Sequence, residues 1–211
     1  MDITRTRTFV NTLWDDSIIP QLCDYIKVPN KSPMFDPEWE QHGYMDQAVT
    51  MLHDWCKHQP IDAMQIEVVR LPGRTPVLFL EIPGQSDDVV LLYGHYDKQP
   101  EFTGWEKDLD PWQPVIREGK LYGRGGADDG YSVFGSLSAI MALRNQGIDH
   151  ARCVIIIEGC EESGSFDLPY YMDLLKHAFV RPVLLFVLTP SAVTMTSFGA
   201  PRHYAEILPG C

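Results

Sequence analysis

The stretch Asp88–Asp97, DVVLLYGHYD, constrains the fold more than any other part of the chain. Its apolar run Val89–Tyr93 is too short for a helix and rich in β-branched and aromatic residues, and Gly94 bounds it, so it predicts a buried strand. His95 and Asp97 then stand at the carboxyl end of that strand, where open α/β sheets gather ligands. An imidazole and a carboxylate there suit a metal site, in which the carboxylate orients the imidazole or a nearby water. The alternative is a histidine that hydrogen-bonds a neighbour.

Composition and charge narrow the class of protein. The 211 residues are 45% hydrophobic, enough for one sizeable core. A net charge of −12 repels phosphate backbones, so we expect no nucleic-acid partner. The five scattered cysteines lack CxxC spacing, which argues against a disulfide framework and favours a reducing compartment. No apolar run suits a signal peptide or a membrane span, so we expect a cytoplasmic protein without membrane contact.

Short apolar runs alternate with helical stripes along the chain. Helices are expected at Ile3–Ile26, at a segment with Asp36 as N-cap, Pro37 as first residue and a buried stripe from Met45 to Cys56, at Val133–Leu143 and at Asp167–His177. Strands are expected at Met64–Leu71, Pro76–Ile82, Val89–Tyr93, Cys153–Ile157 and Pro182–Leu188, and Lys98–Gln113 is expected to be a long loop. This alternation predicts βαβ units and an α/β fold with a mainly parallel sheet.

Two acidic pairs follow apolar or glycine-rich segments: Asp128-Asp129 and Glu161-Glu162. If strand ends bring them to the edge that carries His95 and Asp97, five carboxylates and one imidazole converge. Carboxylates that lie so close raise each other's pKa, and divalent cations remove the conflict. Nitrogen and oxygen ligands without a thiolate favour Zn²⁺, with Mn²⁺ or Co²⁺ also compatible. A carboxylate bridging two ions ~3.5–4 Å apart would make a two-metal hydrolytic site. The alternative for each pair is a solvated turn.

The adjacent glutamates need separate roles. Neighbouring side chains point in different directions, so Glu161 and Glu162 are not both expected to bind one ion. One is expected as a ligand and the other as a general base toward water.

Three motifs, in this order, resemble the co-catalytic zinc peptidases: Gly94–Asp97 (GHYD), Gly123–Asp129 (GRGGADD) and Glu161–Ser165 (EESGS). That family includes carnosinases, bacterial dipeptidases, carboxypeptidase G, aminoacylase and succinyl-diaminopimelate desuccinylase. The spacings agree, with 128 − 95 = 33 and 162 − 128 = 34 residues. The resemblance covers about Ile18–Pro182 and is strongest to the dipeptidase and carnosinase branch. It implies a three-layer α/β sandwich with a mixed, mainly parallel sheet, here incomplete.

The resemblance also assigns roles to residues. It implies two Zn²⁺ ions, with His95 as ligand of one, Glu162 as ligand of the other and Asp128 bridging both. Asp97 would support His95, and Glu161 would be the general base. A cis peptide bond is implied between Asp128 and Asp129. The implied substrates are small peptides or N-acyl amino acids, and full-length relatives are expected to be homodimers.

The chain departs from the family at two places. Gly130-Tyr131 stands where Lys-Gly is usual, which predicts a changed loop without loss of metal. Family chains are about twice as long and add a lid or dimerisation domain, an Asp ligand soon after the Glu pair and a His ligand near the C-terminus. The expected Asp would fall in Val187–Ser191, which has no acid. The second metal site is therefore expected to be incomplete.

We interpret residues 1–186 as a partial catalytic domain without the lid, and 187–211 as a frameshifted tail. Leu188-Thr189-Pro190 and Phe198–Pro201 match chosen codons for Leu-Asp-Ser and Leu-Trp-Cys-Thr read one base late. The alternative is a divergent but genuine C-terminus.

Three functions are compatible with these observations. The first is a zinc-dependent hydrolase of amide bonds in dipeptides or N-acyl amino acids, with little or no activity in these residues alone. The second is a non-catalytic remnant of the fold that keeps a partial metal site. The third is an α/β binding domain whose acids are there by chance, and stoichiometric metal content separates it from the other two.

Overall fold

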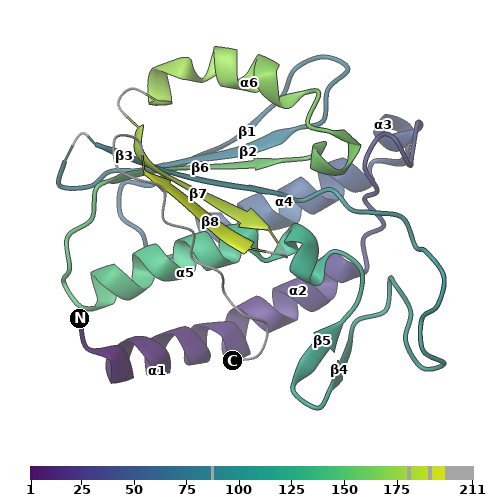
Figure 1. Ribbon diagram of the computed structural model, residues 1–211, viewed down its shortest axis with the longest axis horizontal. Helices are drawn as coiled ribbons and strands as arrows, with labels where there is room; N and C mark the ends of the chain where they lie inside the picture. The colour runs from purple at the N-terminus through teal and green to yellow at the C-terminus, as the bar shows by residue number, and fades with distance from the viewer. Residues whose placement is uncertain (87, 180–181, 190–191, 198–211) are drawn as a thin grey trace.

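The computed structural model describes residues 1–86, 88–179, 182–189 and 192–197. These residues form one six-stranded sheet in the order β1-β2-β6-β3-β7-β8, and a separate hairpin of β4 and β5. The sheet strands are β1 (Gln65–Val69), β2 (Val77–Ile82), β3 (Val89–His95), β6 (Arg152–Glu158), β7 (Pro182–Thr189) and β8 (Ala192–Ser197). Helices lie on both faces (Figure 1), so the three-layer α/β sandwich implied by the resemblance is confirmed.

The sheet is mixed, but its parallel pairing is confined to the centre. Strand β3 pairs in parallel with β6 and with β7. The pairs β1–β2, β2–β6 and β7–β8 are antiparallel. Short connections join only antiparallel neighbours, as the turn around Gly73 between β1 and β2 illustrates. Parallel pairing is therefore less extensive than the sequence pattern predicts.

The N-terminal helix runs over the expected residues and contains a π-helical segment. Helix α1 (Ile3–Leu13) passes through Trp14–Ile18 into α2 (Ile19–Ile26). Pro20 lies at the start of α2 and has no backbone N–H for the carbonyl four residues before it. The helix loosens to a π turn immediately before this residue, as proline interruptions favour.

The second helical segment begins later than expected. Asp36 and Pro37 are not its N-cap and first residue, because α3 spans Trp39–His42. The Asp36 carboxylate instead lies 2.8 Å from Nδ1 of His42. Gly43, with φ 72°, separates α3 from α4 (Tyr44–Lys57) because it can adopt the left-handed conformation. The expected core stripe of α4 is confirmed as buried: Met45, Ala48, Val49, Leu52, Trp55 and Cys56.

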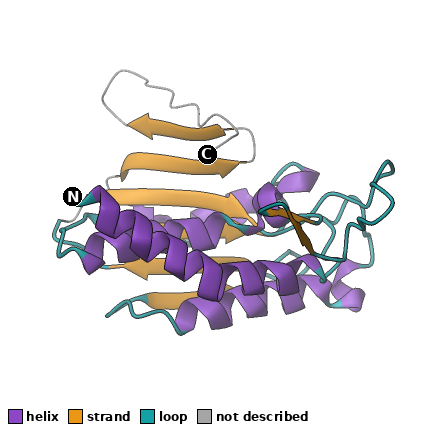
Figure 2. Cartoon of the chain, turned by 90° about the horizontal axis from the view of Figure 1, so that it is seen from below, coloured by secondary structure: helices purple, strands orange, loops and turns teal. Residues whose placement is uncertain are grey.

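Two crossovers connect the central strands. Helix α5 (Ser132–Asn145) leads to β6 on one face of the sheet, and α6 (Leu168–Leu174) leads from β6 to β7 on the other (Figure 1). Helices α2 and α4 share the α5 side, and α1 packs beside α5. Figure 2 shows these helices in front of the sheet, with β7 and β8 extending beyond them. The parallel strands β3 and β6 thus end at one edge.

The expected loop from Lys98 to Gln113 is confirmed as irregular. It leads into the hairpin of β4 (Val115–Arg117) and β5 (Lys120–Tyr122), which the sequence pattern did not predict because three-residue strands show no period. The hairpin stands apart from the main sheet (Figure 1). Among the described residues, no helix combines the length and the apolar character that crossing a membrane requires.

Candidate metal centre

Strand β3 delivers His95 to the sheet edge, two residues beyond the predicted strand end. The residue is 2% exposed. Its Nδ1 lies 3.3 Å from Oδ1 of Asp97. Its Nε2 lies 3.2 Å from Oδ1 of Asp128 and 3.7 Å from Oε2 of Glu161. One ring nitrogen therefore faces a supporting carboxylate and the other faces a group of acids.

Asp97 connects the end of β3 with the segment that follows β6. It is fully buried. Its Oδ1 accepts the backbone N–H of Glu161 at 3.1 Å, and its Oδ2 accepts that of Glu162 at 3.0 Å. A single carboxylate thus orients the His95 ring and fixes the backbone that carries both glutamates.

Asp128 reaches the cluster by a different route from the one expected. It does not follow a strand of the main sheet, because Gly126–Gly130 lies between the separate hairpin and α5. The start of α5 packs against β3, where a Cβ on Gly94 would come within 2.4 Å of the Ser132 Cβ. This close approach brings Asp128 beside His95. The peptide bond between Asp128 and Asp129 is cis, as the resemblance implies.

The two glutamates lie in a short 3₁₀ helix, Glu161–Ser163, after β6. Ligand atoms of His95, Glu161 and Glu162 all lie within 4.8 Å of one another. The amide of Gln99 donates to Oε2 of Glu162. Oε1 of Glu162 is buried and has no hydrogen-bond partner among the described residues. Buried carboxylate oxygens are rarely left unpaired, so this atom fits a cation as its partner.

The pKa values of the clustered groups also favour a bound cation. Burial acts to lower the pKa of His95, but hydrogen bonds to Asp128 and Asp97 outweigh it and raise the pKa to about 11. Burial and the charge of Asp128 raise the pKa of Glu162 to about 7. Burial also raises the pKa of Asp129 to about 8. A divalent cation would relieve this crowding of negative charge. The imidazole and carboxylates, without a thiolate, fit Zn²⁺, Mn²⁺ or Co²⁺.

The structure brings together all five predicted site residues: His95, Asp97, Asp128, Glu161 and Glu162. It adds neighbours that sequence reasoning missed. Gln99 lies in an irregular loop and has no motif around it. Glu158, the last residue of β6, is fully buried, and its Oε1 accepts hydrogen bonds from Tyr93 and Ser165. A charged residue at the end of the apolar run Cys153–Ile157 was the available signal for Glu158.

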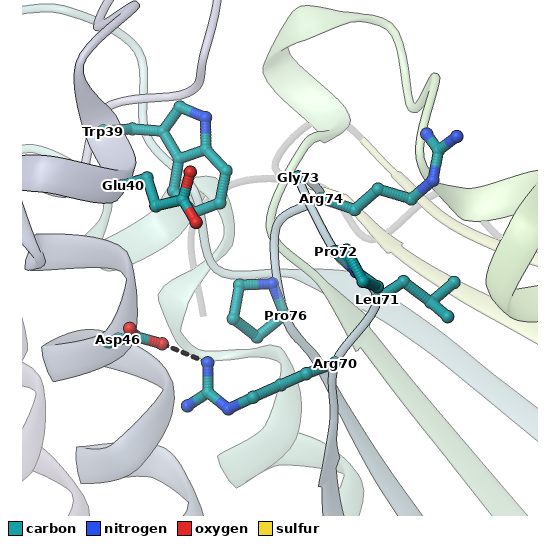
Figure 3. A pocket seen from close by; sticks show the side chains of 9 residues that line it. All are labelled: Trp39, Glu40, Asp46, Arg70, Leu71, Pro72, Gly73, Arg74 and Pro76. Atoms are coloured by element: carbon teal, nitrogen blue, oxygen red, sulfur yellow. Dashed lines mark hydrogen bonds and ion pairs between the residues drawn. The ribbon is translucent and has the colours of Figure 1, made fainter.

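A separate hollow with a volume of about 320 Å³ lies at the turn after β1 (Figure 3). Arg70 and Arg74 line it, and none of the five predicted site residues does. Arg70 is ion-paired with Asp46, and Arg74 lies 2.7 Å from Asp167. Both guanidinium groups are thus already paired with carboxylates.

Sequence comparisons identify a family and individual proteins that are similar to this chain. A sequence model of the peptidase family M20/M25/M40 matches residues 91–196. The chain is 34% identical over 110 residues to the Beta-Ala-His dipeptidase of Homo sapiens, covering 51% of this chain and 22% of that protein. It is 38% identical over 95 residues to the Cys-Gly metallodipeptidase dug1 of Schizosaccharomyces pombe, covering 43% of this chain and 19% of that protein.

Solved structures share the fold. Human carnosine dipeptidase 1 matches with a TM-score of 0.73 and 24% identity, over 90% of this chain and 43% of that one. The dipeptidase Dug1p of Saccharomyces cerevisiae matches with a TM-score of 0.70 and 22% identity, over 92% of this chain and 41% of that one. The chain therefore spans less than half the length of these relatives.

Proposed function

Because the chain belongs to the peptidase family M20/M25/M40, we propose that its acidic cluster binds divalent metal and serves the hydrolysis of peptide or related amide bonds. The observation that carries the proposal is the convergence of His95, Glu161 and Glu162 within 4.8 Å, with Asp128 against the same imidazole nitrogen. A cluster of this kind is hard to explain as a set of solvated turns.

The proposed ligands follow the three motifs. His95 would hold one Zn²⁺ through Nε2, Glu162 would hold the other, and Asp128 would contact both. Mn²⁺ and Co²⁺ suit the same donors. Asp97 lies 3.3 Å from Nδ1 of His95 and would orient its ring, as carboxylates do for metal-bound histidines.

When bound, the metal would polarise the scissile carbonyl and acidify the attacking water. Glu161 is the proposed general base. Its side chain is 38% exposed, so water can reach it, and Asp97 holds its backbone N–H. Glu161 would take a proton from the attacking water and pass it to the leaving amine.

We propose dipeptides and N-acyl amino acids as the substrate class. The named activities of the relatives support this, since they include a Beta-Ala-His dipeptidase and a succinyl-diaminopimelate desuccinylase. We propose the cytoplasm as the compartment. The free thiols of Cys23, Cys56, Cys153 and Cys160 are in keeping with a reducing environment.

A second candidate is a non-catalytic metal-binding remnant of the fold. Among the described residues, the metal-binding group contains a single imidazole, His95, so a second ion would depend on carboxylates alone. On this second proposal, the 211-residue chain would bind metal yet hydrolyse dipeptides weakly or not at all.

Calorimetric titration of the chelator-treated chain with Zn²⁺ tests the proposal. We expect saturable binding that Asp128→Ala weakens at least about tenfold, since loss of a ligand removes a direct bond to the metal. Asp24→Ala, which removes an exposed carboxylate paired with Lys27, should bind as the parent does. Equal affinity of Asp128→Ala and the parent would contradict the proposed site. Zinc-stimulated dipeptide hydrolysis by the parent would decide between the enzyme and the remnant.

A further inference from the structure

A fully buried lysine lies next to the candidate metal centre. Lys98 is 0% exposed, which is rare for this residue type. Its Nζ donates to the backbone carbonyls of Tyr25 and Val28, each at 2.7 Å, and lies 3.9 Å from the centroid of the Tyr25 ring. The described residues place no carboxylate within 4.0 Å of this ammonium. Carbonyl groups in the last turn of α2 and just after it therefore satisfy the ammonium.

The ammonium provides a hydrogen-bond donor for the carbonyl of Val28. Val28 is buried, and no backbone N–H of the described loops and turns donates to its carbonyl. A buried carbonyl without a donor costs about 1–3 kcal/mol, so an apolar side chain at position 98 would fill the space and leave this acceptor unpaired. Lys98 supplies both the packing and the donor.

The stem of Lys98 supports the glycine loop that precedes Asp128. A Cβ on Gly125 would lie 2.5 Å from Cε of Lys98, so the loop backbone rests directly on the lysine stem. At the far end of the loop, a Cβ on Gly130 would lie 2.3 Å from the Tyr25 ring. The loop therefore packs on the side chains of Lys98 and Tyr25. The ammonium of Lys98 in turn lies over the Tyr25 ring.

The backbone of Lys98 is linked to the segment that carries Glu162. Its N–H donates to the carbonyl of Asn30 at 3.1 Å, and its carbonyl accepts the N–H of Ser32 at 3.0 Å. The Ser32 hydroxyl lies 2.5 Å from that of Ser163, the residue after Glu162. Lys98 therefore contacts the loop before Asp128 directly and is linked through Ser32 to the segment that carries Glu162.

We propose that Lys98 is a positioning residue of the metal centre, which clamps the Gly123–Gly130 loop against the end of α2 and so fixes Asp128 relative to His95. The inference rests on the proposed function for its effect on metal binding. The clamp itself is a property of the metal-free chain and can be measured without metal.

The test compares Lys98→Met, which keeps the packing of the stem and loses the ammonium, with the parent chain. Lys31→Met is the matched control, because Lys31 pairs with Lys98 through a β-bridge but binds the partly exposed Glu101. Hydrogen exchange of the metal-free proteins measures the clamp, and Co²⁺ titration followed by visible absorption measures the site. Lys98→Gln, which can still donate to one carbonyl, serves if Lys98→Met does not fold.

We expect Lys98→Met to speed amide exchange in residues 123–130 about tenfold or more, and to weaken Co²⁺ binding about 10–100-fold with an altered absorption spectrum, the range typical of residues that orient ligands. Lys98→Gln should fall between it and the parent, and Lys31→Met should match the parent.

Unchanged exchange in residues 123–130 would overturn the clamp, whatever the metal data show. Faster exchange with unchanged Co²⁺ affinity and spectrum would overturn the positioning role. If the parent itself binds no Co²⁺, the proposed function fails together with that role, and the exchange data alone decide whether the clamp exists.

Discussion

At the scale of single residues, Asp97 does more than its motif indicates. The sequence predicted a partner for the His95 ring, which the 3.3 Å approach to Nδ1 supports. The structure adds two backbone hydrogen bonds, from Glu161 and Glu162. One carboxylate thereby couples the end of β3 to the segment after β6.

Asp97→Asn should therefore weaken metal binding. The amide keeps one acceptor oxygen and turns an N–H₂ group toward a backbone N–H, so it cannot orient His95 and both glutamates at once. We expect a loss of Zn²⁺ affinity of about 10–100-fold by calorimetry. Asp24→Asn, at an exposed carboxylate paired with Lys27, is the control. Parental affinity in Asp97→Asn would refute a supporting role for this residue.

Glu158 predicts a pH dependence of stability. Burial raises the pKa of its carboxyl from 4.5 to about 7. Between these values the folded state holds more protons than the unfolded state, so the contribution of Glu158 to stability falls as the pH rises from about 4.5 to about 7. Glu158→Gln stays uncharged and should lack this component.

Denaturant unfolding of metal-free protein from pH 4.5 to pH 8 measures that component. The free energy of unfolding of the parent, relative to Glu158→Gln, should decline across this interval. Glu67→Gln, at an exposed position on β1, should follow the parent at every pH. A constant difference between the parent and Glu158→Gln would contradict the raised pKa.

The motif residues could be predicted, whereas their supports could not. Two polar residues after an apolar run ending in glycine indicate a strand end, so His95 and Asp97 stand out in the sequence. Lys98 and Gln99 follow directly but read as ordinary loop residues. Their roles depend on Tyr25, Val28 and Glu162, which are distant in sequence and reach them only through the fold.

At the scale of elements, the approach of β3 to α5 sets the geometry of the centre. Gly94 lets the start of α5 come close, since an added Cβ would lie 2.4 Å from the Ser132 Cβ and 2.7 Å from Oδ2 of Asp129. The same Asp129 oxygen accepts the N–H of His95 at 3.2 Å. Strand β3 and the segment that leads into α5 are thus in direct contact at the site.

Gly94→Ala should push α5 away from β3. We expect a loss of about 1–3 kcal/mol in the free energy of unfolding, typical of overpacking, together with weaker metal binding. Gly135→Ala is a matched control within α5, because its Cβ would meet nothing closer than 3.7 Å. That variant should be neutral or more stable by up to about 1 kcal/mol, since alanine favours a helix. Chemical denaturation compares the two, and equal stability would contradict tight packing at Gly94.

Elements with a strong period could be predicted, and those shaped by long-range contacts could not. The stripe of α4 was evident because the helix buries one face, and the run of β6 was evident because both faces of the strand are buried. The hairpin of β4 and β5 was missed, and Asp128 was assigned to a strand end of the sheet, because three-residue strands carry no period. The antiparallel pairing of β2 with β6 joins strands far apart in sequence, which no local pattern specifies.

At the scale of the whole molecule, the chain spans 43% of the length of human carnosine dipeptidase 1 in the structural match. The predicted boundary at residue 186 stays a prediction. The family match runs on to residue 196, and the backbones of β7 and β8 pair through Thr189 and Ala192. Residues 190–191 and 198–211 of the predicted tail lie outside the described residues.

Sequencing of the coding DNA tests the frameshift hypothesis. Restoring one base near codon 187 should open a long reading frame that contains the expected Asp ligand and a further domain. If every frame closes soon after codon 187, residues 187–211 are a divergent but genuine C-terminus.

The central claim is that the end of β3, the segment after β6 and the segment before α5 together form one metal centre. Crystals of the 211-residue chain grown with Zn²⁺, with data collected at the zinc absorption edge, test it most directly. We predict an anomalous peak within bonding distance of His95 Nε2 and Asp128, and a second zinc, where it binds, within bonding distance of Asp128 and Glu162. A map with full zinc occupancy elsewhere on the surface, and none among these three side chains, would contradict the account.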